Sequence, residues 1–149
     1  MTETLAEKYE QTKKLIENVF RTSFGLDPNQ NKLKSPGETI DVWGLSRGSA
    51  TVYIVLTQAT ETNYIQVFSQ VYELSDSVDP DIYPKLLGYN SRMEMCSVAF
   101  AVKDKKVILK SDRTTDDLNE GELIDIIVKV GRLADKYDDI LQNDYGKLK

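Results

Sequence analysis

The chain has 149 residues, of which 40% are apolar and 29% are charged, and its net charge is -5. This length and composition predict one globular domain over residues 1–149, large enough to bury a core of its own. The acidic balance argues against a protein that coats DNA or RNA, because phosphate binding requires a basic footprint. No apolar run approaches the ~20 residues of a membrane-spanning helix, and the charged N-terminus lacks the pattern of a secretory signal. We therefore expect a cytoplasmic protein that contacts neither nucleic acid nor membrane.

The first half of the chain predicts a helix followed by strands. Residues 4–24 place apolar side chains three and four positions apart, as in an amphipathic helix, and Gly25 ends it. The stretch from Leu26 to Glu38 is rich in Asn, Lys, Pro and Gly and has no period, so it predicts a loop. Three β-branched and aromatic runs follow, joined by connections short enough for antiparallel hairpins. These runs are Ile40–Leu45, Ala50–Thr57 and Tyr64–Leu74.

A second helix and a second hairpin are predicted next. Asp79 to Asn90 has helical spacing, and Pro84 is compatible with a helix there only in the first turn. Met95–Val102 and Val107–Ser111 then flank a charged turn, which gives the sheet its fourth and fifth strands.

The last helix has the clearest pattern of all. Asn119 and Glu122 form a capping box at its start, and Gly146 is placed to end it. Apolar residues between them follow the spacing of an amphipathic helix. Ile124 and Val128 widen this apolar stripe, and two interpretations of them stay open: packing against the sheet, or a contact in a homodimer.

The order of these elements, together with the final segment, resembles the YbjN family. The residues that carry the resemblance are Leu118–Leu123, Val130–Asp139 and Asp144–Gly146. Members of that family are similar in fold to class I type III secretion chaperones. The resemblance implies an α+β domain, often dimeric, that lacks known catalytic residues and is associated with chaperoning or regulation. From the pattern of elements we expect an antiparallel five-stranded sheet with the two long helices packed on one face.

Two features of the sequence imitate a reactive site without supporting one. Gly44 to Gly48 matches the G-x-S-x-G pattern of a hydrolase nucleophile, but it lies between two strands rather than before a helix. The chain contains no His to serve as the base, so we interpret this segment as a hairpin turn. One Cys and no His cannot form a zinc site. Cys96 lies in an apolar run, and we expect its thiol to be buried.

The acidic clusters also have structural explanations. Asp138 and Asp139 are adjacent on a helix, where neighbouring side chains point about 100° apart and do not converge. The segment Asp117–Gly121 lacks the ligand spacing of a calcium loop. Asp79 and Asp81 lie where residues cap a helix start. We predict no catalytic residue, no metal and no cofactor.

A surface remains that could bind another protein. Along Tyr64–Leu74, the aliphatic side chains Ile65, Val67 and Val71 share one face of the strand. The opposite face carries Tyr64, Gln66, Phe68, Gln70 and Tyr72. Trp43 and Tyr53 are expected to extend that aromatic row on neighbouring strands. Aromatic residues among amides are typical of protein interfaces, although the same face could instead belong to the core.

We therefore predict a non-catalytic cytosolic module that holds a segment of a partner protein. Its expected partner-binding residues are Trp43, Tyr53, Tyr64, Phe68 and Tyr72. The sequence does not identify the partner. The alternative is a regulatory domain that senses a small ligand in a cavity between sheet and helices, which would require a pocket of several hundred Å³.

Overall fold

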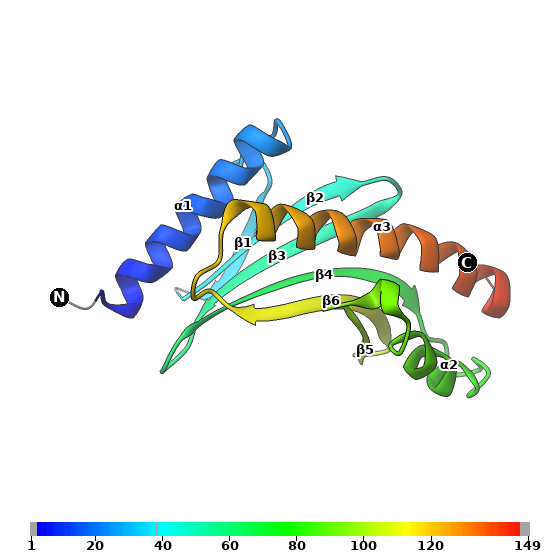
Figure 1. The fold of residues 1–149 in the computed structure, drawn as a ribbon. Coiled ribbons are helices and arrows are strands. Elements are labelled where there is room, and N and C mark those ends of the chain that lie inside the picture. Colours follow the sequence, from blue (N-terminus) through cyan, green and yellow to red (C-terminus); the bar gives the residue numbers. More distant parts are fainter. Residues whose placement is uncertain (1–2, 38, 147–149) are drawn as a thin grey trace.

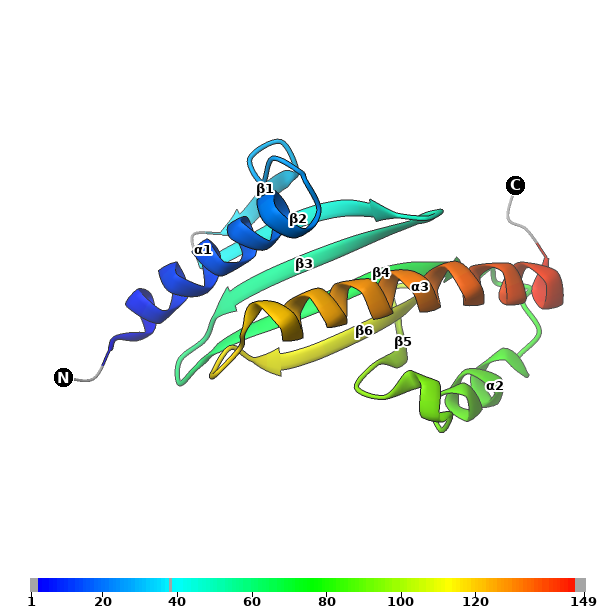
Figure 2. The ribbon, with the colours of Figure 1, turned by 45° about the horizontal axis from the view of Figure 1, so that its top comes forward.

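The chain folds into an α+β structure in which helices cover one face of a single sheet (Figure 1). A computed structural model describes residues 3–37 and 39–146, so both ends of the predicted domain and Glu38 of the predicted loop lie outside the described residues. Helices α1 (Leu5–Ser23) and α3 (Glu120–Tyr145) lie across the same face, whereas α2 (Ile82–Tyr89) packs beside β5 (Figure 2). The placement of the two long helices is as predicted. No helix in the described part of the chain is long and apolar enough to cross a membrane.

The sheet has six antiparallel strands rather than the five predicted. The strands are β1 (Lys32–Gly37), β2 (Ile40–Arg47), β3 (Ala50–Gln58), β4 (Asn63–Glu73), β5 (Ala99–Lys103) and β6 (Lys106–Thr114). Their order across the sheet is β1-β2-β3-β4-β6-β5. Short turns make neighbours of consecutive strands from β1 to β4. The connection through α2 instead carries the chain to the far edge, and β6 returns between β5 and β4.

The additional strand, β1, occupies part of the segment predicted to be a loop. Its Lys32 and Leu33 pair with Trp43 and Val42 of β2. Because β1 is an edge strand it has a partner on one side only, and its ladder shifts register before Gly37. Leu33 is 44% exposed. An edge strand that buries so little carries no apolar alternation, so the sequence pattern did not reveal it.

The core fills the space between the sheet and the two long helices. Alternate residues of β2, β3 and β4 face this space. The buried strand side chains include Trp43, Leu45, Val52, Ile54, Leu56, Ile65 and Val67. They pack with Ile16, Val19 and Phe20 of α1 and with Leu123, Ile127, Val130 and Tyr137 of α3. Ile65, Val67 and Val71 therefore belong to the core, and this side of β4 is the covered face of the sheet.

The helix ends confirm the predicted signals. At the start of α3, the Asn119 side chain accepts a hydrogen bond from the backbone N–H of Glu122, and the Glu122 carboxylate accepts one from the backbone N–H of Asn119. Gly146 ends the helix with a φ of +90°. In α2, Pro84 falls in the first turn, where its missing N–H costs no helical hydrogen bond.

The segment with the hydrolase-like pattern lies at a hairpin, as predicted, but its first four residues, 44–47, belong to β2 and only Gly48 lies in the β2–β3 turn. Arg47 pairs with Ala50, and Gly48 takes a φ of +60° between them. Asp135 of α3 accepts hydrogen bonds from Ser49 and so holds this turn against the helix. The contact is close, because a Cβ atom at Gly131 would lie 2.7 Å from the Cβ of Arg47. The pattern therefore serves packing in this chain.

The prediction that Cys96 is buried is wrong. The apolar run that begins at Met95 does not form one strand, because Met93–Met95 is a short 3-10 helix, η1, and Ser97 adopts a φ of +66°. Strand β5 begins only at Ala99. Cys96 lies in the intervening turn, where its thiol is exposed.

Candidate functional site

The face of the sheet opposite α1 and α3 is the candidate site. We call it the open face, and define it by Val42, Gly44, Tyr53, Val55, Tyr64, Gln66, Phe68 and Lys110 together with Leu33 of β1. Both long helices lie on the other side of the sheet, and α2 lies at its β5 edge (Figures 1 and 2). Most of its side chains are half-buried by their neighbours on the same sheet, and Tyr64 is 46% exposed.

An aromatic row crosses the middle of the open face. Register places Gly44, Tyr53, Phe68 and Lys110 opposite one another on four adjacent strands. The rings of Tyr53 and Phe68 stack with centroids 5.1 Å apart and planes inclined by 26°. Stacked pairs of this geometry are stabilised beyond the burial of their area. The row is therefore a preformed flat apolar surface.

Gly44 allows the row to continue to the edge of the sheet. A Cβ atom at this position would lie 3.5 Å from the Tyr53 ring and 3.8 Å from Leu33 Cδ1. These two side chains therefore flank Gly44 on the same face, and a Cβ atom there would make ordinary van der Waals contact with both. The apolar surface consequently extends from β1 to β4.

Polar groups surround this apolar row. Gln66 and Gln70 lie on β4, and Lys110 and Asp112 of β6 form an ion pair. An apolar centre with a polar rim is the arrangement found in protein interfaces. The side chains of Leu33, Tyr53 and Phe68 carry no carboxylate, thiol or amine, so they offer apolar contact to a bound molecule. The described residues contain no cluster of three or more potential metal ligands.

Two of the five predicted partner-binding residues do not lie on this face. Trp43 is fully buried on the covered face, because it alternates with Val42 and Gly44 of the same strand. Tyr72 is also buried, and its hydroxyl donates to the carbonyl oxygens of Tyr145 and Gly146 at the end of α3. The prediction is therefore corrected to Tyr53, Tyr64 and Phe68.

A β-bulge explains the position of Tyr72. The ladder between β4 and β6 pairs Gln70 with Ile108 and then Tyr72 with Val107, which leaves Val71 as an extra residue. An extra residue inverts the alternation beyond it. Tyr72 consequently shares the covered face with Val107. Simple alternation along Tyr64–Leu74 could not show this, because a bulge changes which residues face the same side.

The proposed dimer residues lie on α3 and are both half-buried. Ile124 packs against the hydrophobic core, so its position in the apolar stripe is explained within one chain. Val128 is half-buried without being part of that core cluster. A dimer contact through these two residues stays a prediction.

The structure also shows an apolar surface that sequence reasoning missed. Between α2 and β5, a hollow of about 200 Å³ is lined by Tyr83, Leu87, Phe100 and Val102, among others. Leu87 is 70% exposed. The signal was present in the sequence, since Tyr83 and Leu87 are four residues apart and share one side of the helix. Helical spacing alone does not reveal such a surface, because it does not show which side of a short helix stays exposed.

The chain belongs to a family of chaperones. Residues 10–146 match the family described as T3SS (YopN, CesT) and YbjN peptide-binding chaperone 1. The match includes both long helices for most of their length and the whole sheet, and this agrees with the resemblance of the last helix to the YbjN family. The family is one of peptide-binding chaperones and not of enzymes.

Solved structures with the same fold include chains of three protein complexes, one of which is described as part of a type III secretion system. A chain of the ExsC-ExsE complex matches with a TM-score of 0.65 and 14% identity, over 89% of this chain and 95% of that one. A chain of the heterodimeric ExoU-SpcU complex from Pseudomonas aeruginosa matches with a TM-score of 0.59 and 13% identity, over 86% and 98%. A chain of the HopA1-SchA chaperone-effector complex has a TM-score of 0.61 at 7% identity, over 93% and 99%.

These identities establish the fold alone. No curated protein sequence matches the chain. The comparisons thus give the family and its architecture, and the particular partner has to be inferred from the surface of this chain.

Proposed function

We propose that this protein holds a segment of a partner protein on the open face of its sheet, as a non-catalytic chaperone or adaptor. The observation that carries the proposal is the stacked pair of Tyr53 and Phe68, which lies on a sheet face without a covering helix in the described residues. The family consists of peptide-binding chaperones, and the chains in all three of the similar structures come from complexes named for two proteins. An exposed thiol at Cys96 fits the reducing cytoplasm, where we place this activity.

The shape of the aromatic row favours an amphipathic helix as the bound segment. The row from Leu33 on β1 to Phe68 on β4 spans three strand spacings, or about 14 Å. A helix of about nine residues has that length and presents apolar side chains at i, i+4 and i+7 along one side. The aromatic row would contact this stripe, and the polar rim would contact the flanks of the helix.

The first experiment compares tagged wild-type protein and the Phe68→Asp variant as baits in the native cytosol, with captured proteins identified by mass spectrometry. A carboxylate in the middle of the row would lie beneath any bound helix and would lose its hydration there, which is costly. We expect a stoichiometric partner to be captured by the wild type and to be lost from the variant.

Three further baits separate binding from folding. Phe68→Tyr retains the ring and should retain the partner, and Asn143→Asp adds the same charge to an exposed position of α3 and should behave as wild type. Tyr64→Asp tests the open face at its most exposed aromatic side chain. Circular dichroism should show all variants folded. Capture of the same proteins by wild type and Phe68→Asp would contradict the proposal, and unfolding of Phe68→Asp and Tyr64→Asp would assign the face to the core.

The small-ligand alternative has less support in the structure. The space between the sheet and the long helices is filled by the core side chains. Two hollows of about 540 and 670 Å³ are open to solvent and have charged residues in their walls. A thermal-shift screen with metabolites tests this alternative directly.

A further inference from the structure

Strand β6 has a free edge beside a cavity. β5 pairs with β6 only from Lys106 to Lys110, and the last pair is Ala99 with Lys110. β6 continues to Thr114 and pairs there with β4 on its other side. Residues 111–114 therefore have no strand partner on the β5 side among the described residues. The chain cannot continue β5 backwards along this edge, because η1 and Ser97 turn it away.

The main-chain groups exposed at this edge are those of Asp112 and Thr114. Thr115 donates its backbone N–H to Asn63 O at 3.1 Å, on the β4 side. Backbone N–H and C=O groups alternate in direction along an antiparallel strand. The backbone groups of Ser111 and Arg113 therefore also point to β4, and those of Asp112 and Thr114 point to the free edge. The Thr114 carbonyl accepts from Arg113 Nε at 2.9 Å. The main-chain N–H and C=O of Asp112 have no partner on this side among the residues that the structure describes, and they are available for pairing.

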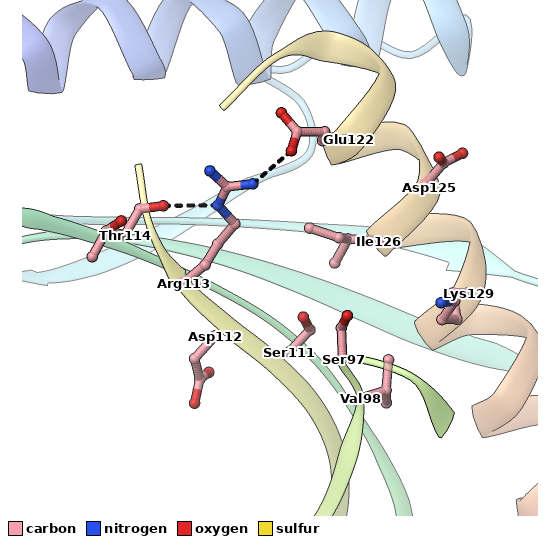
Figure 3. Close-up of a pocket in the computed structure, with 10 residues that line it drawn as sticks. All are labelled: Ser97, Val98, Ser111, Asp112, Arg113, Thr114, Glu122, Asp125, Ile126 and Lys129. Carbon is pink, nitrogen blue, oxygen red and sulfur yellow. Dashed lines mark hydrogen bonds and ion pairs between the residues drawn. The ribbon is translucent and has the colours of Figure 1, made fainter. Parts of the chain in front are cut away.

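A cavity of about 540 Å³ adjoins this edge, between β6, the turn at residues 97–98 and the first turns of α3 (Figure 3). Ile126 extends from α3 towards the strand, whereas Asp112 points away from Ile126 and Arg113 (Figure 3). Val98 supplies a second apolar wall. The cavity lies within the usual size range of ligand pockets.

The charges of the cavity favour a basic ligand. Three carboxylates and two cationic groups line it. Arg113 is held by Glu122 at 3.0 Å and by the Asp116 carbonyl at 2.8 Å. Lys129 donates to the Cys96 carbonyl at 3.1 Å. Asp125, one turn before Lys129, has no ion-pair partner in residues 3–37 and 39–146, so its charge is available to a bound cation.

We propose that the free edge of β6 binds a second, extended part of the partner protein by strand addition, with a Lys or Arg side chain of that part at Asp125. The added strand pairs with the main chain of Asp112 and Thr114, and its side chains on the cavity side contact Ile126 and Val98. This inference rests on the proposed function, because it assumes a peptide ligand. It assigns a different surface, on the opposite side of β6 from the aromatic row.

The test uses two capped peptides of about eight residues in which Ser and Val alternate around a central Lys or a central Glu. Each is added to the isotope-labelled full chain, and backbone amide signals are followed by NMR. We expect the Lys peptide to shift the amides of Asp112 and Thr114 and to slow hydrogen exchange at Asp112. The Glu peptide should bind about three-fold more weakly or worse, as expected for a partly exposed ion pair.

Variants separate the main chain from the side chains. Asp112→Pro removes an N–H that faces the free edge, which a sheet tolerates, together with the ion pair to Lys110, and should abolish binding of both peptides. Asp112→Asn keeps that N–H and should bind as wild type. Asp125→Asn should remove the preference for Lys over Glu, whereas Asp139→Asn, at an exposed position farther along α3, should not.

Several results would overturn the proposal. These are the absence of an NMR shift at the Asp112 amide, shifts confined to the open face, equal binding of the Lys and Glu peptides to the wild-type protein, or unchanged peptide binding by Asp112→Pro. The Phe68→Asp variant distinguishes this proposal from the previous one, because it should still bind the Lys peptide. If that variant binds the peptide and also keeps its captured partner, the open face is excluded and the β6 edge remains. If Phe68→Asp loses its captured partner and neither peptide binds to the wild type or to any variant, the β6 edge is excluded and the open face remains.

Discussion

The two faces of this sheet are made of the same strands, but helices cover only one of them. On the covered face, Trp43, Ile54 and Val67 are fully buried under two helices. On the open face, Tyr53 and Phe68 lie on the same strands and remain half-buried, with their rings stacked on each other. The covered face therefore determines stability, and the open face has apolar surface left for another molecule. Mutations at matched positions on the two faces can test this division.

The largest effect is expected at Trp43, the largest side chain fully buried on the covered face. Trp43→Ala should lower the free energy of unfolding by about 3–5 kcal/mol, because it leaves a cavity in the core. Trp43→Phe should cost much less, since the indole N–H has no hydrogen-bond partner among the described residues. Urea denaturation measures both. If Tyr53→Ala were as damaging as Trp43→Ala, the two faces would not differ as we describe.

A smaller effect is expected from the polar contact at the edge of the covered face. Asp41 accepts a hydrogen bond from the Tyr9 hydroxyl at 2.5 Å and pairs with Lys32 at 2.7 Å. Burial alone would raise the pKa of Asp41, but the hydrogen bonds from Lys32 and Tyr9 outweigh it and hold the pKa below its ordinary value of 3.8. Asp41→Asn should destabilise the fold by about 2 kcal/mol at neutral pH, as expected for hydrogen bonds to a charged group.

The sign of the pH dependence follows from the lowered pKa. When the pKa of an acid is lower in the folded state, the acid contributes its full stabilisation at pH values above its pKa in the unfolded chain. That stabilisation is lost as the pH falls through its pKa in the folded protein. The difference in unfolding free energy between wild type and Asp41→Asn should therefore be constant above about pH 5 and shrink below pH 3.8. A difference that grew on acidification would show that Asp41 is not stabilised as its contacts indicate.

The contact between α3 and the β2–β3 turn should be sensitive to a single methyl group. At Gly131, a Cβ atom would meet the Cβ of Arg47 at 2.7 Å, which is too close to be accommodated without movement. Gly131→Ala should lower the unfolding free energy by about 1–2 kcal/mol, because overpacking outweighs the better helix propensity of Ala. Gly88→Ala in α2 is the matched control, since nothing lies within 4 Å there. Thermal unfolding should show the first variant destabilised and the second unchanged or improved.

The smallest effect is expected on the open face. A double-mutant cycle of Tyr53→Ala and Phe68→Ala should give a coupling of about 0.5–1 kcal/mol from ring stacking. Each single variant should still fold cooperatively, because neither ring belongs to the core cluster. A coupling above about 2 kcal/mol, measured by urea denaturation, would mean that the pair supports the fold itself. It would then be a poor candidate for a binding surface.

The sequence predicted the elements whose signals are local. Helical spacing and the capping box at Asn119 gave α3 with the correct start, and short polar turns gave the hairpins. The same reasoning missed β1, whose few buried side chains leave no period to detect. It also misplaced Cys96, because an apolar run does not show whether the chain turns within it.

The candidate site was predicted only where strict alternation holds. Tyr64 and Phe68 lie on the same face because no irregularity separates them in β4. Tyr72 was misassigned because the bulge at Val71 inverts the alternation, and Trp43 because two strands must be placed in register before their faces can be matched. Both errors concern pairing between strands, which depends on residues far apart in the chain.

By itself, the sequence determined the class of the fold, the ends of the two long helices and the absence of His, because composition and local hydrogen bonding depend on nearby residues alone. Only the tertiary structure decided which face of the sheet the helices cover, and that β6 extends beyond β5 to leave a free edge beside α3. These features arise from register, bulges and packing between distant segments. They are also the features on which the two proposed binding surfaces depend.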